Sequence, residues 1–493
     1  MFLNTFKKTN IIIFSLFLMV CSVHGVSFSG FNHGNWLYSQ HGFNEVVINP
    51  TNGTIADALK ISDYVLLMPG TYTGDGNVNI NISGNKHIRA TDLETAIIDG
   101  KGEIKLFNVE KNSILNLTNL VLTGGNDSTG NGGAIFSNGT LNLEGCVVQD
   151  NTATTGGSIY INTNNTFSFI NTKILNNRGT LGAGVYIDGC NGVVKNTTFE
   201  NNGNLDPNIY VFGSGLFIVK NFDINITDSI FNGNKGGFGG GLEIMGSPDD
   251  MSSKAVISNS VFRDNEEIAS GAGMSCTYAN VSILNSKFYN NKIDEKYDIY
   301  KYSNGAGVYT AYCNLNIKNS EFRNNSGLYG SGLCNENGTN TSIEDCNFTD
   351  NVARGYGAGM VVLDGNLDVK NTKFMNNSAN MDTSIDDNNG GGIYFFNGNI
   401  KIDNSTFKTN HAHHGGGLDT RFANVNIKNS LFDSNNAVYG GGVYSREGTI
   451  NMSNSALSNN TVSMNGGGIY NLNGSTTIEK CNITSNVAVD NGG

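Results

Sequence analysis

The chain has 493 residues, of which 64 are glycine, 4 are proline and 15% are charged. A hydrophobic content of 38%, placed at regular intervals, argues against disorder and indicates an ordered core. The formal net charge of −12, without any basic run, argues against nucleic acid or anionic membrane surfaces as partners.

The first 25 residues have the pattern of a secretory signal. Lys7 and Lys8 precede an apolar run over 11–21, and a small-residue site follows near Gly25. A signal anchor is the alternative, although the apolar run is short for a membrane span, and no later stretch is apolar enough for one. Removing both lysines with the leader changes the net charge from −12 to −14.

Export would permit disulfides, yet the chain after the leader keeps an odd number of cysteines, seven. Cys146, Cys346 and Cys481 share one position of the repeat, two residues before a core apolar residue. We therefore expect buried or unpaired cysteines rather than a disulfide framework. Sequons such as Asn280 and Asn451 would be glycosylated in a eukaryotic host, and the sequence does not settle the host.

Residues 26–45 carry no motif that we can assign. Residues 46–125 are predicted to form an N-terminal cap and the first, irregular coils: a strand at 46–48, a short amphipathic helix at 54–60, and a strand at 64–68. Such a helix would cover the open end of a stacked sheet, where unpaired backbone invites aggregation.

From about residue 126 a repeat sets in and continues to residue 493. Superposing Gly415–Asn435 on Gly440–Asn460 with an offset of 25 residues matches the apolar positions, for example Leu418 on Val443 and Phe432 on Leu457. Apolar and polar residues alternate, which predicts strands and excludes helices. Thirteen glycine-led units of this kind occur, each too small to bury a core alone, so the sequence predicts a β-solenoid.

Each column of the repeat has a predicted role. The phenylalanines, one per unit, should stack inside the coils. The asparagine three residues later should lie in a turn with left-handed angles and bond its own backbone or the next asparagine. The paired glycines should allow a tight bend with positive φ.

The glycine-led starts, such as GGAI at Gly132–Ile135, and the F-x-x-N elements resemble the repeats of the chlamydial polymorphic outer-membrane proteins. The wider pattern, with PGTYTG at 69–74 and TAIIDG at 95–100, is similar to the pectin-lyase-like superfamily. This resemblance implies an all-β, right-handed parallel β-helix. The chlamydial proteins end in an outer-membrane barrel, and this chain stops within a glycine-led start, so we expect a fragment.

An enzyme of the pectin-lyase-like kind would need clustered acids. Asp249–Asp250 and Asp386–Asp387 are adjacent acids, but both pairs fall in insertions and are expected to be solvated. His411 and His413, with His414, are weak candidates for a Zn²⁺ or Cu²⁺ site, and an exposed turn is favoured. The sequence therefore indicates no catalytic residues and no cofactor.

Two surfaces remain as candidates for binding. One is a column of aromatic residues expected to point outward, which could stack on sugars, anchor a protein, or stack with each other to stiffen the sheet. Its members are Phe136, Tyr160, Tyr186, Phe217, Tyr309, Tyr394, Tyr444 and Tyr470.

The second surface consists of insertions that enter at one corner of the coil, where solenoids often bind partners. They carry acidic residues and tyrosines, although simple loop drift is the favoured explanation: Asp294, Glu295, Tyr297, Tyr300, Tyr302, Asp386 and Asp387.

The resulting hypothesis is a secreted, cell-surface or outer-membrane β-helix protein that acts in adhesion or display and is not an enzyme. Its partner would be a cell-surface glycan or protein. The alternatives are a pectin-lyase-like polysaccharide lyase or glycoside hydrolase, and a purely structural wall or coat protein.

Overall fold

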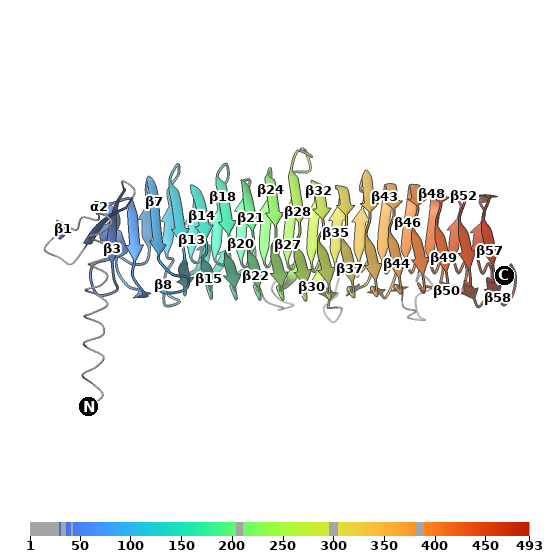
Figure 1. Cartoon of the computed structure of the whole chain (residues 1–493), viewed down its shortest axis with the longest axis horizontal. Helices are drawn as coiled ribbons and strands as arrows, with labels where there is room; N and C mark the ends of the chain where they lie inside the picture. Colours follow the sequence, from blue (N-terminus) through green and yellow to red (C-terminus); the bar gives the residue numbers. More distant parts are fainter. Residues whose placement is uncertain are drawn as a thin grey trace, which may run out of the picture.

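The structure, a computed structural model, describes residues 29–30, 36–40, 43–203, 211–294, 304–379 and 389–492. This part of the chain winds as a right-handed parallel β-solenoid, an elongated rod with the N-terminal strands at one end and the C-terminal strands at the other (Figure 1). Its single helix is α2, Ile55–Ile61. The predicted fold class is confirmed.

Each coil contributes strands to three faces of the rod. A short strand follows the glycine-led turn, and a second strand follows it within the same 31-stranded sheet. The phenylalanine strand lies in a 16-stranded sheet, and a very short strand after it belongs to small sheets of two, six or three strands. Because successive coils pair in parallel, every strand except those at the ends lies between its equivalents in the neighbouring coils.

The strands fall into four runs. The first strands of the coils are β6 (Ile80–Ile82), β9 (Phe107–Val109), β13 (Ile135–Ser137), β17 (Ile159–Ile161), β20 (Val185–Asp188), β23 (Leu216–Val219), β27 (Leu242–Met245), β31 (Met274–Thr277), β35 (Val308–Ala311), β39 (Leu333–Glu336), β51 (Val443–Arg446) and β55 (Ile469–Leu472). The second strands are β4 (Tyr64–Leu67), β7 (Asn85–Ala90), β10 (Ile114–Thr118), β14 (Thr140–Glu144), β18 (Thr166–Ile170), β21 (Asn191–Lys195), β24 (Asp223–Thr227), β28 (Lys254–Ser258), β32 (Asn280–Leu284), β36 (Asn314–Lys318), β40 (Asn340–Glu344), β52 (Thr449–Ser453) and β56 (Ser475–Glu479). First and second strands are continuous in β43 (Met360–Lys370), β46 (Ile393–Asp403) and β48 (Leu418–Lys428).

The 16-stranded sheet is made of β5 (Gly70–Tyr72), β8 (Ala96–Asp99), β11 (Leu120–Thr123), β15 (Val147–Gln149), β19 (Lys173–Leu175), β22 (Thr198–Glu200), β25 (Ile230–Asn232), β29 (Val261–Arg263), β33 (Lys287–Tyr289), β37 (Glu321–Arg323), β41 (Asn347–Thr349), β44 (Lys373–Met375), β47 (Thr406–Lys408), β49 (Leu431–Asp433), β53 (Ala456–Ser458) and β57 (Asn482–Thr484). The small sheets contain β12 (Asn126–Asn131), β16 (Thr152–Thr155), β26 (Lys235–Phe238), β30 (Glu266–Ser270), β34 (Lys292–Ile293), β38 (Ser326–Gly327), β42 (Val352–Ala353), β45 (Ser378–Ala379), β50 (Asn436–Ala437), β54 (Thr461–Val462) and β58 (Val487–Ala488).

The N-terminal end is closed by a hairpin and the helix. β1 (Ser29–Gly30) and β2 (Trp36–Gln40) pair antiparallel, β2 pairs antiparallel with β3 (Phe43–Ile48), and β3 pairs in parallel with β4. In α2, Thr54 is the N-cap and accepts a hydrogen bond from the backbone N–H of Asp57, and Ile55, Ala58 and Leu59 are buried. The predicted helix and both predicted strands are confirmed. The hairpin, which begins within the residues to which we assigned no motif, was missed.

The predicted 25-residue register is confirmed pair by pair. Leu418 pairs with Val443, Val425 with Ile450, and Phe432 with Leu457 in parallel ladders. The offset read from apolar residues is therefore the true stacking register.

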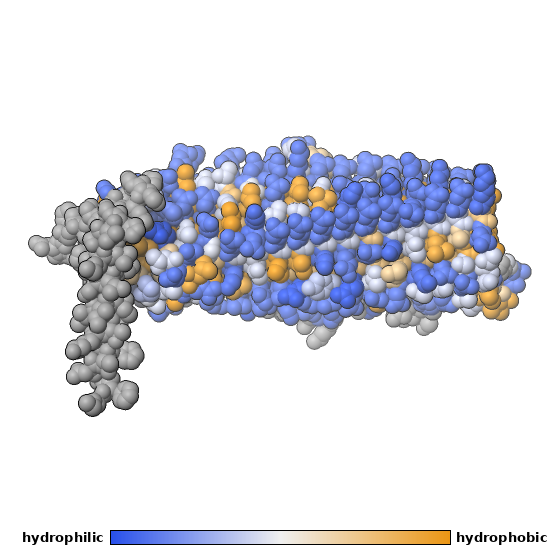
Figure 2. All heavy atoms as spheres, in the orientation of Figure 1, coloured by the Kyte–Doolittle hydropathy of each residue, from blue (hydrophilic) through white to orange (hydrophobic). Residues whose placement is uncertain are grey.

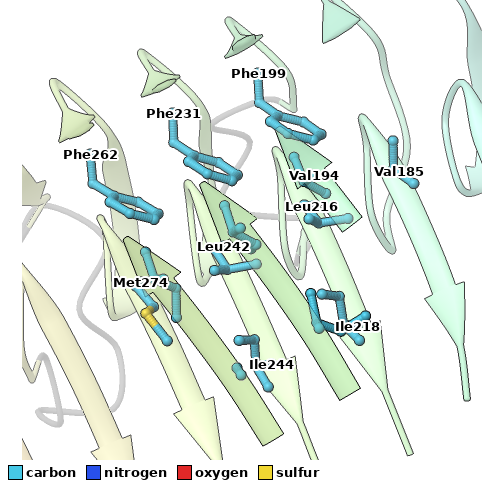
Figure 3. Packing of buried hydrophobic residues seen from close by; sticks show 14 of the residues in the cluster. Val185, Val194, Phe199, Leu216, Ile218, Phe231, Leu242, Ile244, Phe262 and Met274 are labelled. Atoms are coloured by element: carbon cyan, nitrogen blue, oxygen red, sulfur yellow. The ribbon is translucent and has the colours of Figure 1, made fainter. Parts of the chain in front are cut away.

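The phenylalanines form one continuous stack inside the rod. Nine rings follow one another with centroid separations of 4.5–5.1 Å, every neighbouring pair nearly parallel, and Figure 3 shows three of them above the leucines and isoleucines of the facing sheet. All but Phe432 rank among the largest side chains with under 2% exposure, and Phe432 itself is 0% exposed. The rings are Phe199, Phe231, Phe262, Phe288, Phe322, Phe348, Phe374, Phe407 and Phe432.

The asparagine three residues after each ring is buried and forms a second ladder. Asn325 Nδ2 donates to Asn351 Oδ1 at 3.0 Å and to the carbonyl of Phe288 at 3.0 Å. Its own Oδ1 accepts from the Nδ2 and backbone N–H of Asn291. One asparagine thus ties together three coils, as the prediction of bonds between coils required.

The predicted left-handed angle of this asparagine is wrong. The positive φ belongs to the preceding residue, for example 57° at Asn290 before Asn291 and 54° at Asn324 before Asn325. The exposed corner residue takes the left-handed turn, and this leaves the buried asparagine free to project inward and bond along the stack.

The cysteine position is part of a third ladder, made mostly of hydroxyls. Ser286 N–H donates to Ser320 Oγ at 3.1 Å, and Cys346 N–H donates to Thr372 Oγ1 at 3.3 Å. The seven cysteines of the described residues are free, and all except Cys481 are buried. The expectation of buried or unpaired cysteines is confirmed for the described residues.

The glycine starts have two separate roles. The first glycine of each start has positive φ, for example 61° at Gly305, as predicted. The third glycine approaches the next coil so closely that a Cβ on Gly332 would lie 2.4 Å from the carbonyl oxygen of Gly359. A side chain there would push the coils apart.

Candidate functional site

A surface groove of about 950 Å³ runs along the second strands from β32 to β52. Two rows of side chains border it, and we call it the amide groove. The first row is Asn280, Asn314, Asn340, Asn366, Asn399 and Asn424; the second is Ser282, Asn316, Ser342, Asp368, Lys401, Asn426 and Asn451.

Strand alternation places these side chains on the surface. Between the two rows, Val281, Leu315 and Leu367 point into the core with 1–2% exposure, so the residues on either side of them must face outward. Figure 2 shows hydrophilic residues in rows along the rod. The floor of the groove is therefore backbone, and its walls are polar side chains.

The first row is ordered by hydrogen bonds between coils. Asn314 Nδ2 donates to Asn280 Oδ1 at 2.9 Å, and Asn399 Nδ2 donates to Asn366 Oδ1 at 3.0 Å. Because an amide has two donor hydrogens and two acceptor lone pairs, each such residue keeps hydrogen-bonding capacity for a ligand. Asp368 and Lys401 are the charged residues of the lining, and they are register partners.

Aromatic rings lie at the edge of the groove. Tyr278 and Tyr312 each precede a first-row asparagine by two residues, and their rings stack at 4.9 Å with an interplanar angle of 5°. Tyr312 is 46% exposed, and Phe422, two residues before Asn424, is 47% exposed. Exposed ring faces beside amides can hold the apolar faces and the hydroxyls of sugars at once.

Sequence analysis missed the amide groove. The signal was present in the alternation of segments such as NLNIKNS (314–320) and NVNIKNS (424–430), whose first residue recurs from coil to coil. We treated these segments as evidence for strands and did not follow their outward positions.

The predicted aromatic column does exist, and its rings contact one another where consecutive coils carry aromatic residues, at Phe136, Tyr160, Tyr186 and Phe217 and again at Tyr444 and Tyr470. Phe136 and Tyr160 lie 5.4 Å apart, Tyr160 and Tyr186 5.2 Å, and Tyr186 and Phe217 5.3 Å between centroids. Phe217, Tyr394 and Tyr444 are each 5% exposed.

The segment before each glycine start covers this column. Phe212 stacks on Phe217, Tyr356 on Tyr394, and His414 packs against Tyr444. The column and its cover form what we call the outer layer. Phe217, Tyr394 and Tyr444 are therefore not available to a partner, whereas the other five rings of the column are half-buried. The alternative of mutual stacking fits the contacts between neighbouring rings.

Of the acidic insertion residues, only Asp294 lies among the described residues, where it is half-buried. Glu295, Tyr297, Tyr300, Tyr302, Asp386 and Asp387 lie outside them. The surface predicted from them stays a prediction.

The histidines are arranged differently from the prediction. His413 and His414, not His411 and His413, come together, with their Nδ1 atoms 3.3 Å apart. His414 Nδ1 also lies 2.6 Å from Asn389 Oδ1, and its ring stacks on Tyr439 at 5.3 Å. Burial is the main cause that lowers the pKa of His414 to about 3, and the neighbouring His413 lowers it further.

No three side chains of His, Cys, Asp or Glu converge as metal ligands within the described ranges. Asp249 and Asp250 are exposed, and Asp250 accepts hydrogen bonds from Ser252, as expected of a solvated loop. Likewise, no helix in the described part of the chain is both long and apolar enough to span a bilayer.

Comparison with known proteins agrees with the right-handed β-helix fold. A family model described as a right-handed beta helix region matches residues 306–488. No curated protein matches the chain. The closer resemblance to the chlamydial repeats remains a hypothesis.

Several solved structures are similar to the chain. The A-module of the mannuronan C-5 epimerase AlgE6 of Azotobacter vinelandii is 14% identical, with a TM-score of 0.31 and coverage of 85% of this chain and 90% of that one. The periplasmic alginate epimerase AlgG is 11% identical, with a TM-score of 0.34 and coverages of 90% and 86%. The tailspike gp49 of the Acinetobacter baumannii bacteriophage Fri1, a capsular polysaccharide depolymerase, is 13% identical, with a TM-score of 0.31 and coverages of 69% and 61%.

Proposed function

We propose that this protein is exported and acts at the cell surface as a β-solenoid that binds an uncharged glycan along the amide groove without cleaving it. The observation that carries the proposal is the groove itself: two rows of outward amides and hydroxyls, with the half-buried Tyr278 and the exposed Tyr312 and Phe422 at its edge.

The chemistry of the walls favours a neutral ligand. Sugar hydroxyls need paired donors and acceptors, which amides supply, whereas the opposite charges of Asp368 and Lys401 give the groove no net charge. The chain as a whole carries a net charge of −12, which repels acidic polysaccharides at long range.

The lining also favours binding over hydrolysis. Glycoside hydrolysis uses two carboxyl groups that flank one bond. Among the residues that line the groove, Asp368 is the one carboxylate, and its register partner is Lys401. Repetition of the same walls over successive coils supports multivalent contact, which suits adhesion or display.

The proposal is tested by calorimetric titration with linear neutral glucan, mannan and xylan oligosaccharides, with alginate and polygalacturonate oligosaccharides as acidic comparators. Bacterial expression is appropriate because the sequons at Asn280 and Asn451 lie in the groove. We expect saturable binding of a neutral oligosaccharide that Tyr312→Ala and Asn316→Ala each weaken by about tenfold, equivalent to about 1.4 kcal/mol. Tyr289→Ala, on the phenylalanine-strand face, is the matched control and should bind as the wild type does.

Three results would contradict the proposal. Equal binding by the Tyr312→Ala and Asn316→Ala variants would remove the groove as the site. Release of unsaturated or reducing ends, lost on mutation of Asp249 and Asp250 or of Asp386 and Asp387, would favour the polysaccharide lyase or hydrolase instead. Absence of saturable binding to any glycan or to cells would favour a structural wall or coat protein.

A further inference from the structure

Two carboxylates, Glu243 and Glu267, are buried in the middle of the rod. The register position of Glu243 carries one other buried acid in the described coils, Asp419, whereas that of Glu267 carries small or apolar residues. Glu243 on β27 occupies the aromatic column, in register with Phe217 before it and Ser275 after it. Glu267 on β30 stands in register between Gly236 and Ile293. Glu243 is 2% exposed and Glu267 is 0% exposed.

The two side chains approach a pair of neighbouring glycines, Glu243 at Gly239 and Glu267 at Gly240. A Cβ added to Gly239 would collide with Glu243 Oε2, and a Cβ added to Gly240 would lie 2.7 Å from Glu267 Oε1. The same position at Gly240 is 2.7 Å from the carbonyl oxygen of Ala272. Two carboxylates and a backbone carbonyl therefore line one small region between coils, and the absence of side chains on Gly239 and Gly240 leaves it room.

Most of these carboxylate oxygens have no partner. Glu243 Oε2 and both carboxylate oxygens of Glu267 are buried without a hydrogen bond of normal geometry, although the backbone N–H of Ile268 lies near the Glu267 carboxylate. No lysine or arginine pairs with either residue in the described ranges, and Ser275 is the one side chain that offers Glu243 a hydrogen bond. Burying two unpaired carboxylates costs several kcal/mol per ion unless something compensates the charge.

We propose that Glu243 and Glu267 bind a divalent cation of the calcium class between coils, with the Ala272 carbonyl and the Ser275 hydroxyl as further oxygen ligands. Calcium takes six to eight oxygen ligands in flexible geometry, which carboxylates, carbonyls, hydroxyls and water supply. Two negative charges match one divalent ion. Because both carboxylates are closed off from solvent, the cation enters as the coils stack during folding, and its role is to join them.

A shared proton is the competing compensation. Burial raises the pKa of Glu243 to about 8, and burial together with the Glu243 charge raises the pKa of Glu267. The nearby ionisable groups are the Glu266 carboxylate and the Cys276 thiol, and neither adds a positive charge. A proton and a cation predict different behaviour above pH 8, since deprotonation exposes the bare pair to its own repulsion unless a cation is present.

The test is refolding of the full chain from denaturant at about pH 9, above the Glu243 pKa of about 8, with calcium, with magnesium, or with chelator. We expect calcium to raise the unfolding temperature by about 2 °C or more over chelator, and magnesium to raise it less. Terbium refolded into the protein should emit when tyrosine is excited, because Tyr309 follows Ser275 in register. Glu243→Gln with Glu267→Gln should abolish the calcium shift and weaken terbium binding at least tenfold.

Asp249→Asn with Asp250→Asn removes two exposed acids from the loop after β27 and is the matched control, which should keep both signals. Circular dichroism of each variant establishes that it has folded. The terbium signal of the wild type tests the site even if a variant does not fold. An unfolding temperature that is the same in calcium and chelator, terbium emission that the glutamine variants retain, or an equal response to magnesium would overturn the proposal. The test uses no glycan, so its outcome is independent of the amide groove.

Discussion

Two columns of this rod carry aromatic residues, and they differ in how regularly those residues recur. The inner column has nine phenylalanines in succession, from Phe199 to Phe432, every ring fully buried. The outer column changes chemistry repeatedly at the same register: Phe217 is followed by Glu243, Ser275, Tyr309 and Cys334.

The difference follows from what surrounds each column. An inner ring is held between the rings of two neighbouring coils and faces the opposite sheet. Replacing it with a side chain of another shape therefore leaves a cavity that three coils line. An outer residue is covered by a single segment before the glycine start, which differs from coil to coil. The inner column therefore sets the winding, whereas the outer layer can accommodate sites such as the glutamate pair.

Loss of an inner ring should be the most damaging single change. Phe322→Ala removes the contacts with Phe288 at 5.1 Å and Phe348 at 4.5 Å, and we expect about 3–5 kcal/mol of lost stability. Urea denaturation followed by circular dichroism measures it. Phe322→Leu, which refills part of the volume, should recover a fraction; a loss below about 1 kcal/mol in the alanine variant would mean that the column does not hold the coils together.

The asparagine ladder beside the inner column should come next. Asn325→Ala leaves the N–H groups of Asn291 and the carbonyl of Phe288 without their partner, at a cost of about 1–3 kcal/mol for a buried unpaired group. The same denaturation measurement applies. Asn324→Gly is the neighbouring control, since Asn324 is an exposed corner residue whose φ of 54° glycine adopts without strain; equal losses in the two variants would contradict the ladder's role.

The inner column, the register and the glycine turns could be predicted from sequence because each depends on one local pattern repeated many times. Phe432 and Leu457 were paired correctly from apolar spacing alone. The outer layer could not be predicted, because alternation shows that Tyr186 points away from the core but says nothing of the segment that covers it. The amide groove was visible as recurring outward asparagines, whereas the meeting of Glu243 with Glu267 depends on two strands of different sheets.

An outer ring should matter less than an inner one. Tyr186→Ala removes stacking on Tyr160 and an edge contact with Phe217, and we expect about 1–2 kcal/mol. Tyr186→Phe keeps the ring and should be nearly neutral, whereas Phe322→Tyr buries a hydroxyl in the inner stack and should destabilise clearly. If the two tyrosine–phenylalanine exchanges had equal effects on urea denaturation, the distinction between the columns would fail.

The smallest effect at neutral pH should come from His414 of the outer layer. Its folded pKa of about 3 lies below the unfolded value of about 6.5, so the unfolded chain takes up a proton first as pH falls. The stability that His414 contributes is complete above about pH 6.5 and is lost progressively as the pH falls toward 3. Thermal unfolding of His414→Gln should match the wild type at pH 7–8 and depend less on pH between 6.5 and 4. The groups around the ring are His413, Asn389, Arg421, Arg446, Tyr439 and Tyr444.

A wild-type and a variant curve that stay parallel down to pH 4 would show that the ring is protonated in the folded chain. That result would place His414 in contact with water and reopen the covered outer layer as a surface. A divergence confined to pH below 6.5 would instead mean that the cover over Tyr444 excludes solvent, as the 5% exposure of that tyrosine requires. At His414 and Tyr444 the outer layer would then exclude solvent as the inner column does, although the two differ in composition.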